Sequence, residues 1–270
     1  MEQLYQPLIQ FLGRFVQADR KRESLSSLSP ELQQTLDDYS GFMTDIHNQR
    51  LWDELKAGEV EELHALAVQL RDISARSVST MEKIRAYKLL NGGNEGHDYF
   101  RNIEASIEKE FGSFTVSANS KVLLIGSGAF PMTPLLIAQR TGAEVVGIDI
   151  DPEAVELGKK VVERLGPKLP IQLENLSLER LQNIGEMTHI IISSTVSVKY
   201  ELLDQMHSAA CPDVVVAMRF GNGLKSLFNY PMEEVDNRKW RLAESIVRAD
   251  HVFDVALYRK AGTPHQAGRD

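Results

Sequence analysis

The chain has 270 residues, 43% of them hydrophobic and 25% charged, so it can bury a core as one large domain or two modest ones. Acidic residues outnumber basic ones by 38 to 30, and the formal charge of −8 argues against a protein that binds a nucleic-acid backbone. The single cysteine, Cys211, excludes an intrachain disulfide and fits a reducing compartment. No apolar run approaches the roughly 20 residues of a membrane span, and the N-terminus lacks the apolar core of a signal peptide. We therefore expect a cytoplasmic protein with no membrane partner.

Residues 1–114 are predicted to form a helical domain. Leu4, Leu8, Phe11 and Phe15 recur at helical spacing, which gives the first helix one apolar face. No alternating strand pattern interrupts this half, so we expect about five helices. After the first, they are predicted to start at Pro30 and to run over residues 60–73, 78–90 and 98–111.

Residues 115–262 instead alternate short apolar strands with helices, which predicts a parallel sheet covered on both faces. The last two predicted strands are separated by only four residues, so they must form an antiparallel hairpin. An α/β domain of this layout resembles the Rossmann-like sheet of class I methyltransferases. The polar tail, residues 263–270, is expected to be flexible. Strands are predicted over residues 121–125, 144–149, 171–173, 189–192, 213–218, 241–247 and 252–258, and helices over 133–140, 152–165 and 199–210.

The most informative segment is a strand that runs into Gly126-Ser127-Gly128 and then into a helix. Such a tight turn needs glycines, because they admit positive φ and let a ligand approach the backbone closely. About 20 residues on, the next strand ends in Asp149, the position where a nucleotide-binding sheet places a carboxylate on ribose hydroxyls. Together these features predict a nucleoside site, with Ile150 available to pack on the adenine.

The glycine pattern also bears on which nucleoside is bound. A dinucleotide fingerprint has a third glycine, so that the helix can pack close to a pyrophosphate. Pro131 occupies that position here. The departure disfavours NAD and favours S-adenosylmethionine, which has a ribose, an adenine and an amino-acid arm in place of phosphates.

Three stretches resemble the nicotianamine synthase family. IGSGAFPMTPLLIA is followed by GIDIDPEAVELG, and Pro-x-Thr after the glycines is rare in ordinary methyltransferases. The third stretch, VVVAMRFGNGLKSLFNYP, has an arginine, Arg219, near its strand end and then an aromatic-rich step to Tyr230-Pro231. The chain is short for a plant-type member, and the resemblance is closest to the smaller bacterial histidine 2-aminobutanoyltransferases that make opine metallophores of the staphylopine and pseudopaline type.

This resemblance implies a reaction and a set of residues. S-adenosylmethionine would donate its 2-aminobutanoyl group to the α-amine of histidine, with release of methylthioadenosine. By position in the family pattern, Glu82 and Tyr99 match residues that line the acceptor pocket and would take the amine's proton. Arg219 would hold a substrate carboxylate, and Tyr230 would help to close the same pocket. A downstream opine dehydrogenase is an expected partner, and a homodimer is another, because family members often pair.

Other functions remain open from the sequence. The same sheet and ribose acid would serve nicotianamine synthesis, plain methyl transfer, or a non-catalytic nucleoside-binding protein. D- and L-histidine cannot be distinguished, and neither can the number of aminobutanoyl units added. The seven histidines show no pair at i, i+4, so no metal is expected in catalysis.

Overall fold

The computed structural model of the chain describes residues 1–20, 29–93 and 110–262. Its contacts divide the chain into two compact units. The helical unit comprises Met1–Asn102 together with Phe220–Met232 and Arg248–Phe253, and the sheet unit comprises Ile103–Arg219, Glu233–Val247 and Asp254–Asp270. Two short stretches from the second half of the sequence thus pack with the N-terminal helices. The predicted domain boundaries at residues 114 and 262 stay a prediction.

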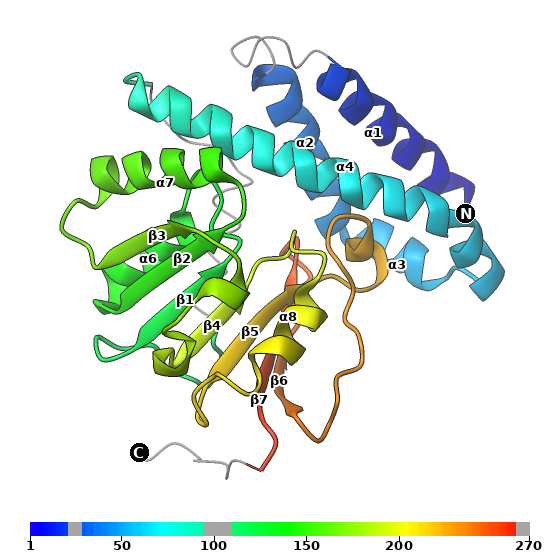
Figure 1. Cartoon of the computed structure of the whole chain (residues 1–270). Coiled ribbons are helices and arrows are strands. Elements are labelled where there is room, and N and C mark those ends of the chain that lie inside the picture. Colours follow the sequence, from blue (N-terminus) through cyan, green and yellow to red (C-terminus); the bar gives the residue numbers. More distant parts are fainter. Residues whose placement is uncertain (21–28, 94–109, 263–270) are drawn as a thin grey trace. The chain divides into compact units, whose positions relative to one another are not determined.

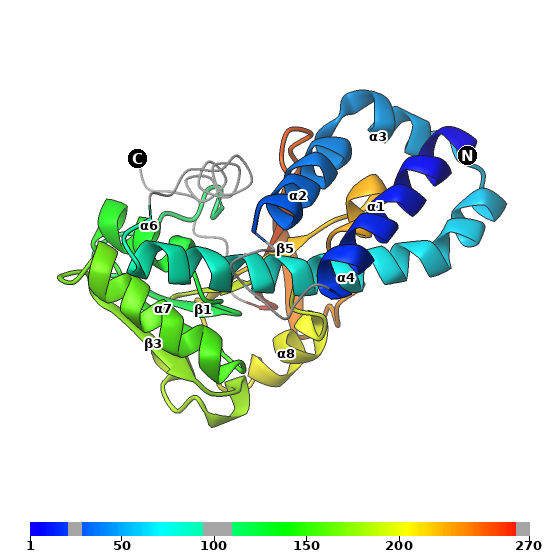
Figure 2. The same ribbon diagram turned by 90° about the horizontal axis from the view of Figure 1, so that it is seen from above.

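The described part of the helical unit contains four α-helices (Figure 1). The predicted apolar face of the first helix is confirmed, because Leu4, Leu8, Phe11 and Phe15 are all buried. The first, second and fourth helices pack against one another (Figure 2). Most of the predicted helix over residues 98–111 lies outside the described residues. The helices are α1 (Glu2–Arg20), α2 (Ser29–Thr44), α3 (Ile46–Asp53) and α4 (Ala57–Leu90).

Two details of this unit differ from the sequence-based expectation. The two helices predicted over 60–73 and 78–90 are one helix, α4, of 34 residues. Between them the sequence has no glycine or proline, and the buried Ser74 hydroxyl donates within the helix to the carbonyl of Arg71 at 3.1 Å. The sequence reading also missed α3. Asp45 caps it by accepting hydrogen bonds from the backbone amides of His47 and Asn48.

An aromatic cluster joins the stretch after residue 220 to the helices of this unit. Tyr39 is fully buried, and its ring contacts the rings of Phe11, Phe15 and Phe228. Its hydroxyl donates to the carbonyl of Leu227 at 2.8 Å, and burial holds the pKa of Tyr39 well above its usual range. The short 3₁₀ helix η3 (Gly223–Leu227) is thereby held in the helical unit.

The sheet unit is built on seven strands in the order β3-β2-β1-β4-β5-β7-β6 (Figure 1). The first five strands are parallel, and β6 pairs with β7 in the antiparallel direction, as predicted. The strands next to the centre are almost continuously buried, as expected of a parallel sheet that is covered on both faces. The strands are β1 (Lys121–Ile125), β2 (Glu144–Asp149), β3 (Ile171–Asn175), β4 (His189–Ile192), β5 (Val215–Phe220), β6 (Trp240–Ile246) and β7 (Asp254–Lys260).

The direction in which successive strands are added to the sheet reverses between β1 and β4, and we call this position the switch point. From β1 the chain steps outward through α6 (Met132–Thr141) to β2, and through α7 (Pro152–Leu165) to β3. It then crosses back by way of two 3₁₀ turns to β4 and continues through α8 (Lys199–Met206) to β5. Ligands of open α/β sheets bind outside the carboxyl ends of the strands at such a point. The predicted Rossmann-like class I methyltransferase layout is confirmed.

Among the described residues, no helix combines the length and apolarity needed to cross a membrane.

A buried histidine at the amino end of β4 gives a prediction about acid stability. His189 lies edge-on to Phe111, with 4.7 Å between the ring centroids, and burial lowers its pKa from 6.5 to about 4. The unfolded chain therefore binds a proton between pH 6.5 and pH 4 that the folded chain does not. The free energy of unfolding is therefore highest above pH 6.5, and it falls by about 3 kcal/mol as the pH drops from 6.5 toward 4.

Urea unfolding at pH 7, 5.5 and 4.5 measures this loss. His189→Asn cannot take up a proton, so its free energy of unfolding should depend less on pH over this range than that of the wild type. Equal slopes for the two proteins would contradict the assignment.

Candidate functional site

The turn after β1, residues 126–128, adopts the conformation that its glycines permit. Gly126 and Gly128 have φ values of 82° and 67°, a region that side-chain-bearing residues rarely adopt. A Cβ on Gly126 would also lie 3.0 Å from Cγ2 of Val196. We call this turn the glycine elbow. It leaves the carboxyl end of β1, beside the switch point in the strand order.

Asp149 ties the end of β2 to the glycine elbow. Its Oδ2 accepts a hydrogen bond from the amide of Gly128 at 2.9 Å, and its Oδ1 accepts one from the amide of Asp151 at 3.0 Å. A carboxylate has about four lone-pair sites, so this half-buried group keeps capacity to accept from further hydroxyls. Next to it, the side chain of Ile150 is 80% exposed, which is unusual for a large apolar residue. The pair presents hydrogen-bond acceptors and a bare apolar surface side by side.

Two further features of the elbow fit a bound nucleoside. Ser127 is buried, yet its Oγ has no hydrogen-bond partner within the described part of the chain. Pro131, buried where a dinucleotide site has its third glycine, faces α7 at Gly158. A Cβ at Gly158 would come within 3.2 Å of the Gly128 carbonyl oxygen. The glycine needed for close packing of the elbow is therefore on α7 and not on the turn itself.

Arg219 lies near the end of β5, as predicted, and is buried. Its Nε and Nη2 donate to the two carboxylate oxygens of Glu110 at 2.6 and 2.8 Å, and Nη2 also donates to the hydroxyl of Thr133 at 3.0 Å. This two-pronged geometry is the strongest form of arginine–carboxylate pairing. A substrate carboxylate on this guanidinium would have to share it with Glu110, so the predicted contact between Arg219 and the substrate stays a prediction.

Comparison with known proteins places the chain. No protein-family model matches it. An L-histidine 2-aminobutanoyltransferase of Pseudomonas aeruginosa is 30% identical over 231 residues, covering 86% of this chain and 87% of the relative. The enzyme of the same name from Yersinia pestis is 31% identical over 253 residues, covering 92% of this chain and 87% of the relative. The chain belongs to the L-histidine 2-aminobutanoyltransferase family.

Solved structures agree at the level of the fold. MtNAS in complex with MTA and tNA has a TM-score of 0.72 and 17% identity, covering 95% of this chain and 98% of that one. A glutamate-to-glutamine mutant of MtNAS in complex with S-adenosylmethionine has a TM-score of 0.64, covering 93% of this chain and 98% of that one. The predicted resemblance to nicotianamine synthase-like proteins, and within them to the histidine 2-aminobutanoyltransferases, is confirmed.

The acceptor-side residues predicted for this aminobutanoyltransferase-family chain belong to the N-terminal half. Glu82 is half-buried on α4, with Met81 and Ile84 buried beside it. Tyr99 lies outside the described residues. These assignments stay predictions of the family resemblance.

Tyr230 is held within the helical unit by residues of α4. The guanidinium of Arg71 lies 5.3 Å from the centroid of the Tyr230 ring, and its Nε donates to the carbonyl of Ser226 at 2.7 Å. The Tyr230 hydroxyl lies 3.4 Å from Oδ1 of Asp72. Burial lowers the pKa of Arg71, while Tyr230 and Asp72 favour its charged form. The expectation that Tyr230 closes the acceptor pocket stays a prediction.

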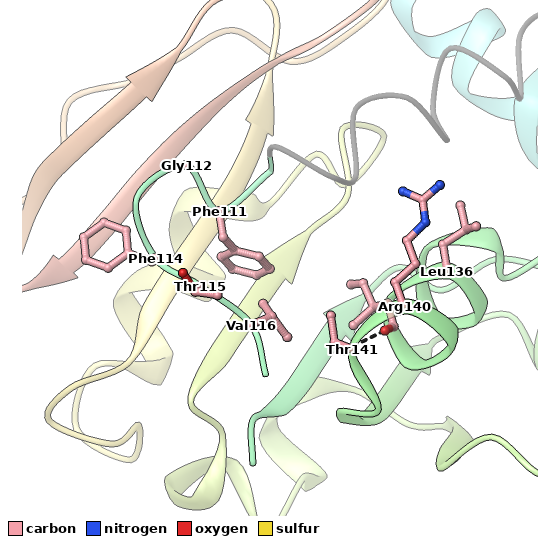
Figure 3. Close-up of a pocket in the computed structure, with 9 residues that line it drawn as sticks. Phe111, Gly112, Phe114, Thr115, Val116, Leu136, Arg140 and Thr141 are labelled. Carbon is pink, nitrogen blue, oxygen red and sulfur yellow. Dashed lines mark hydrogen bonds between the residues drawn. The ribbon is translucent and has the colours of Figure 1, made fainter. Parts of the chain in front are cut away.

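A cavity of about 310 Å³ lies in the sheet unit (Figure 3). The segment from Phe111 to Val116, which precedes β1, lines one side, and the second half of α6 lines the other. These residues are near the amino ends of the strands, whereas the elbow is at the carboxyl ends. The cavity therefore does not belong to the candidate nucleoside site at the elbow. Among the described residues, no cluster of histidine, cysteine, aspartate or glutamate is arranged to hold a metal ion.

Three residues with well-defined contacts around the elbow were not singled out in the sequence. Glu110 carried no signal that separated it from the other acids, and Lys199, at the start of the helix predicted over residues 199–210, carried none that separated it from the other lysines. Thr133 could have been found, because it is the threonine of the Pro-x-Thr motif. The structure gives that motif a role, since its hydroxyl accepts a hydrogen bond from Arg219.

Proposed function

We propose that this protein transfers the 2-aminobutanoyl group of S-adenosylmethionine to the α-amine of histidine and releases methylthioadenosine. The observation that carries the proposal is the family relationship, at about 30% identity over most of the chain. The relatives are named for L-histidine, which favours the L-enantiomer as the acceptor. In the product the imidazole stays free to bind a metal, as a metallophore precursor requires.

The glycine elbow supports S-adenosylmethionine as the co-substrate. Asp149 would accept hydrogen bonds from the ribose hydroxyls, and Ile150 would pack on the adenine. The hydroxyl of Ser127 has no partner within the described part of the chain and would be a further donor there, whereas the amides of residues 126–128 already donate to Ile148 and Asp149. Two solved proteins of this fold, MtNAS and its mutant, bind MTA and S-adenosylmethionine respectively. Pro131 stands where a dinucleotide fingerprint has its third glycine, which argues against a dinucleotide.

The step balances without a further reactant. The lone pair of the histidine α-nitrogen forms a bond to Cγ of the aminobutanoyl group, and the Cγ–sulfur bond breaks with its electron pair left on sulfur. A positive sulfonium thus becomes a neutral thioether, and the amine loses one proton. A sulfonium carries three electrophilic carbons, and the one that reacts is the one within about 3–3.5 Å of the nucleophile in line with the departing sulfur.

The amine must be unprotonated to attack, so a base is needed. We assign this role to Glu82, with Tyr99 as its neighbour in the acceptor pocket, by match to the family pattern. A positioned base of this kind contributes typically 10²–10⁴-fold to the rate. Arg219 and Tyr230 are kept as candidate substrate residues. We also propose that the protein acts in the cytoplasm, which its single cysteine supports, that it forms a homodimer, and that a downstream opine dehydrogenase uses its product.

Mass spectrometry of the purified protein with S-adenosylmethionine and each histidine enantiomer tests the proposal. We expect methylthioadenosine and an aminobutanoyl-histidine in equal amounts with L-histidine, and neither without an acceptor. S-adenosylhomocysteine as the product would instead establish methyl transfer. A product with more than one aminobutanoyl unit would indicate nicotianamine-type synthesis. Binding of S-adenosylmethionine without any product would leave a nucleoside-binding protein.

A further inference from the structure

Lys199, the first residue of α8, is the most deeply buried lysine of the described chain. Its relative exposure is 0%. A charged ammonium is costly to remove from water unless it gains strong partners. A lysine that ordinarily keeps its charged end in solvent is therefore held here by specific contacts.

Two of these contacts are with backbone carbonyls at the ends of neighbouring strands. Nζ donates to the carbonyl of Arg219 near the end of β5 at 2.6 Å, and to the carbonyl of Ser194 just after β4 at 3.1 Å. Hydrogen bonds from an ionised donor are about twice as strong as neutral ones. Lys199 thus clamps the main chain at the carboxyl ends of two parallel strands, β4 and β5, which are adjacent in the sheet.

The segment that Lys199 clamps after β4, residues 193–198, rests directly on the glycine elbow. The amide of Ser193 donates to the carbonyl of Ile125 at 3.1 Å, and its hydroxyl donates to the carbonyl of Gly126 at 2.8 Å. Cγ2 of Val196 lies where a Cβ on Gly126 would be crowded. A change in the position or mobility of residues 193–198 would therefore also change the position of the elbow.

Arg219, whose carbonyl accepts one of the hydrogen bonds from Lys199, is also connected to the elbow through its side chain. The guanidinium of Arg219 donates to the hydroxyl of Thr133, which lies in the first turn of α6, five residues after Gly128. These contacts form a closed ring within the sheet unit, which runs from the elbow through residues 193–198, Lys199 and Arg219 to α6 and back to the elbow. Loss of the Lys199 ammonium would break the ring between residues 193–198 and Arg219.

We propose that Lys199 is a positioning residue that sets the affinity of the elbow for S-adenosylmethionine. It acts through the main chain of residues 193–198 and of Arg219, and touches neither substrate, because its side chain has no exposed surface. This inference rests on the proposed function only in placing S-adenosylmethionine at the elbow.

Lys199→Met tests it, because methionine is unbranched and of similar length but has neither charge nor donor. We expect the KM for S-adenosylmethionine to rise about tenfold, the size expected for the loss of charge-assisted hydrogen bonds. The KM for histidine should stay within about twofold. A merely structural role would reduce the fraction of active protein, which lowers the apparent kcat and leaves both KM values unchanged. Lys168→Met, at an exposed position after α7, is the matched control and should behave as the wild type.

Amide hydrogen exchange supplies a readout that does not need the co-substrate. In Lys199→Met the amides of Ser193 and Val196, both hydrogen-bonded in the wild type, should exchange at least about tenfold faster, while those of β2 are unchanged. Ser193→Ala removes only the bond to Gly126 and is the alternative variant if Lys199→Met does not fold. It should raise the KM for S-adenosylmethionine two- to fivefold by rough estimate.

The outcomes separate this inference from the proposed function. An unchanged KM and unchanged exchange in a variant of an active enzyme would overturn the role of Lys199 and leave the function intact. A wild-type protein that binds S-adenosylmethionine but transfers nothing would defeat the proposed reaction, and the dissociation constants of the variants would still decide the role of Lys199. A wild type that does not bind S-adenosylmethionine would overturn both.

Discussion

Glu82→Gln is expected to lower kcat by about 10³-fold, within the 10²–10⁴ range of a positioned general base, and to leave the dissociation constant for S-adenosylmethionine within about twofold. Glutamine keeps the shape of the side chain and its hydrogen-bonding reach but cannot accept a proton at neutral pH. The histidine amine would then have to lose its proton to water. Quantifying methylthioadenosine in single-turnover reactions measures the chemical step, and calorimetric titration of S-adenosylmethionine measures the binding.

The same helix offers a matched control. Glu61 is an exposed carboxylate of α4, and Glu61→Gln should change neither turnover nor binding. Glu82 is half-buried and interacts with other groups of the protein, so its substitution could also affect stability. Thermal unfolding of both variants must therefore show that the fold is retained. Turnover of Glu82→Gln within tenfold of the wild type would remove Glu82 from the mechanism and direct attention to Tyr99.

Glu110→Gln is expected to destabilise the sheet unit by about 3 kcal/mol and to lower its melting temperature by about 10 °C. Glu110 and Arg219 are both buried, with side-chain exposures of 0% and 7%, and they pair at 2.6 Å. Removing one partner of a buried ion pair leaves the other charge without full compensation, which is what makes such a change costly. Chemical denaturation followed by circular dichroism measures the free energy of unfolding.

An exposed ion pair of equal length provides the comparison. Lys121 and Glu186 also lie 2.6 Å apart, but their side chains are 39% and 59% exposed. Glu186→Gln should therefore cost at most about 1 kcal/mol. The double variant Glu110→Gln with Arg219→Met should recover part of the loss, because no buried charge then lacks a partner.

The Glu110 variant also distinguishes two roles of Arg219. If Arg219 mainly positions the end of β5 and the start of α6, stability falls as stated. If Arg219 instead serves chiefly as the holder of a substrate carboxylate, Glu110→Gln would leave stability near that of the wild type and would change the KM for histidine. The second result would restore the direct substrate contact expected from the family pattern.

Local sequence signals were sufficient for most of the sheet unit. The bounds of β1, β2, β4 and α7 agree with the predicted ranges to the residue. Each strand is a short apolar run that ends in a turn signal, and α7 begins with an aspartate cap followed by proline. The elbow with Asp149 also followed from spacing alone, since a tight strand-to-helix turn has few sequence solutions. In these places the physical cause lies within about ten residues of its effect.

The tertiary structure decided the rest. That residues 220–232 pack with the N-terminal helices depends on contacts between segments far apart in sequence. The pairing of Arg219 with Glu110 spans 109 residues, and nothing in either neighbourhood announces it. Lys199 could not be told from a solvated lysine by sequence, because burial belongs to the packed chain and not to the residue. The sequence alone therefore determined the fold class, the conformation of the glycine elbow and the family, whereas only packing determined which charges are buried and what they hold in place.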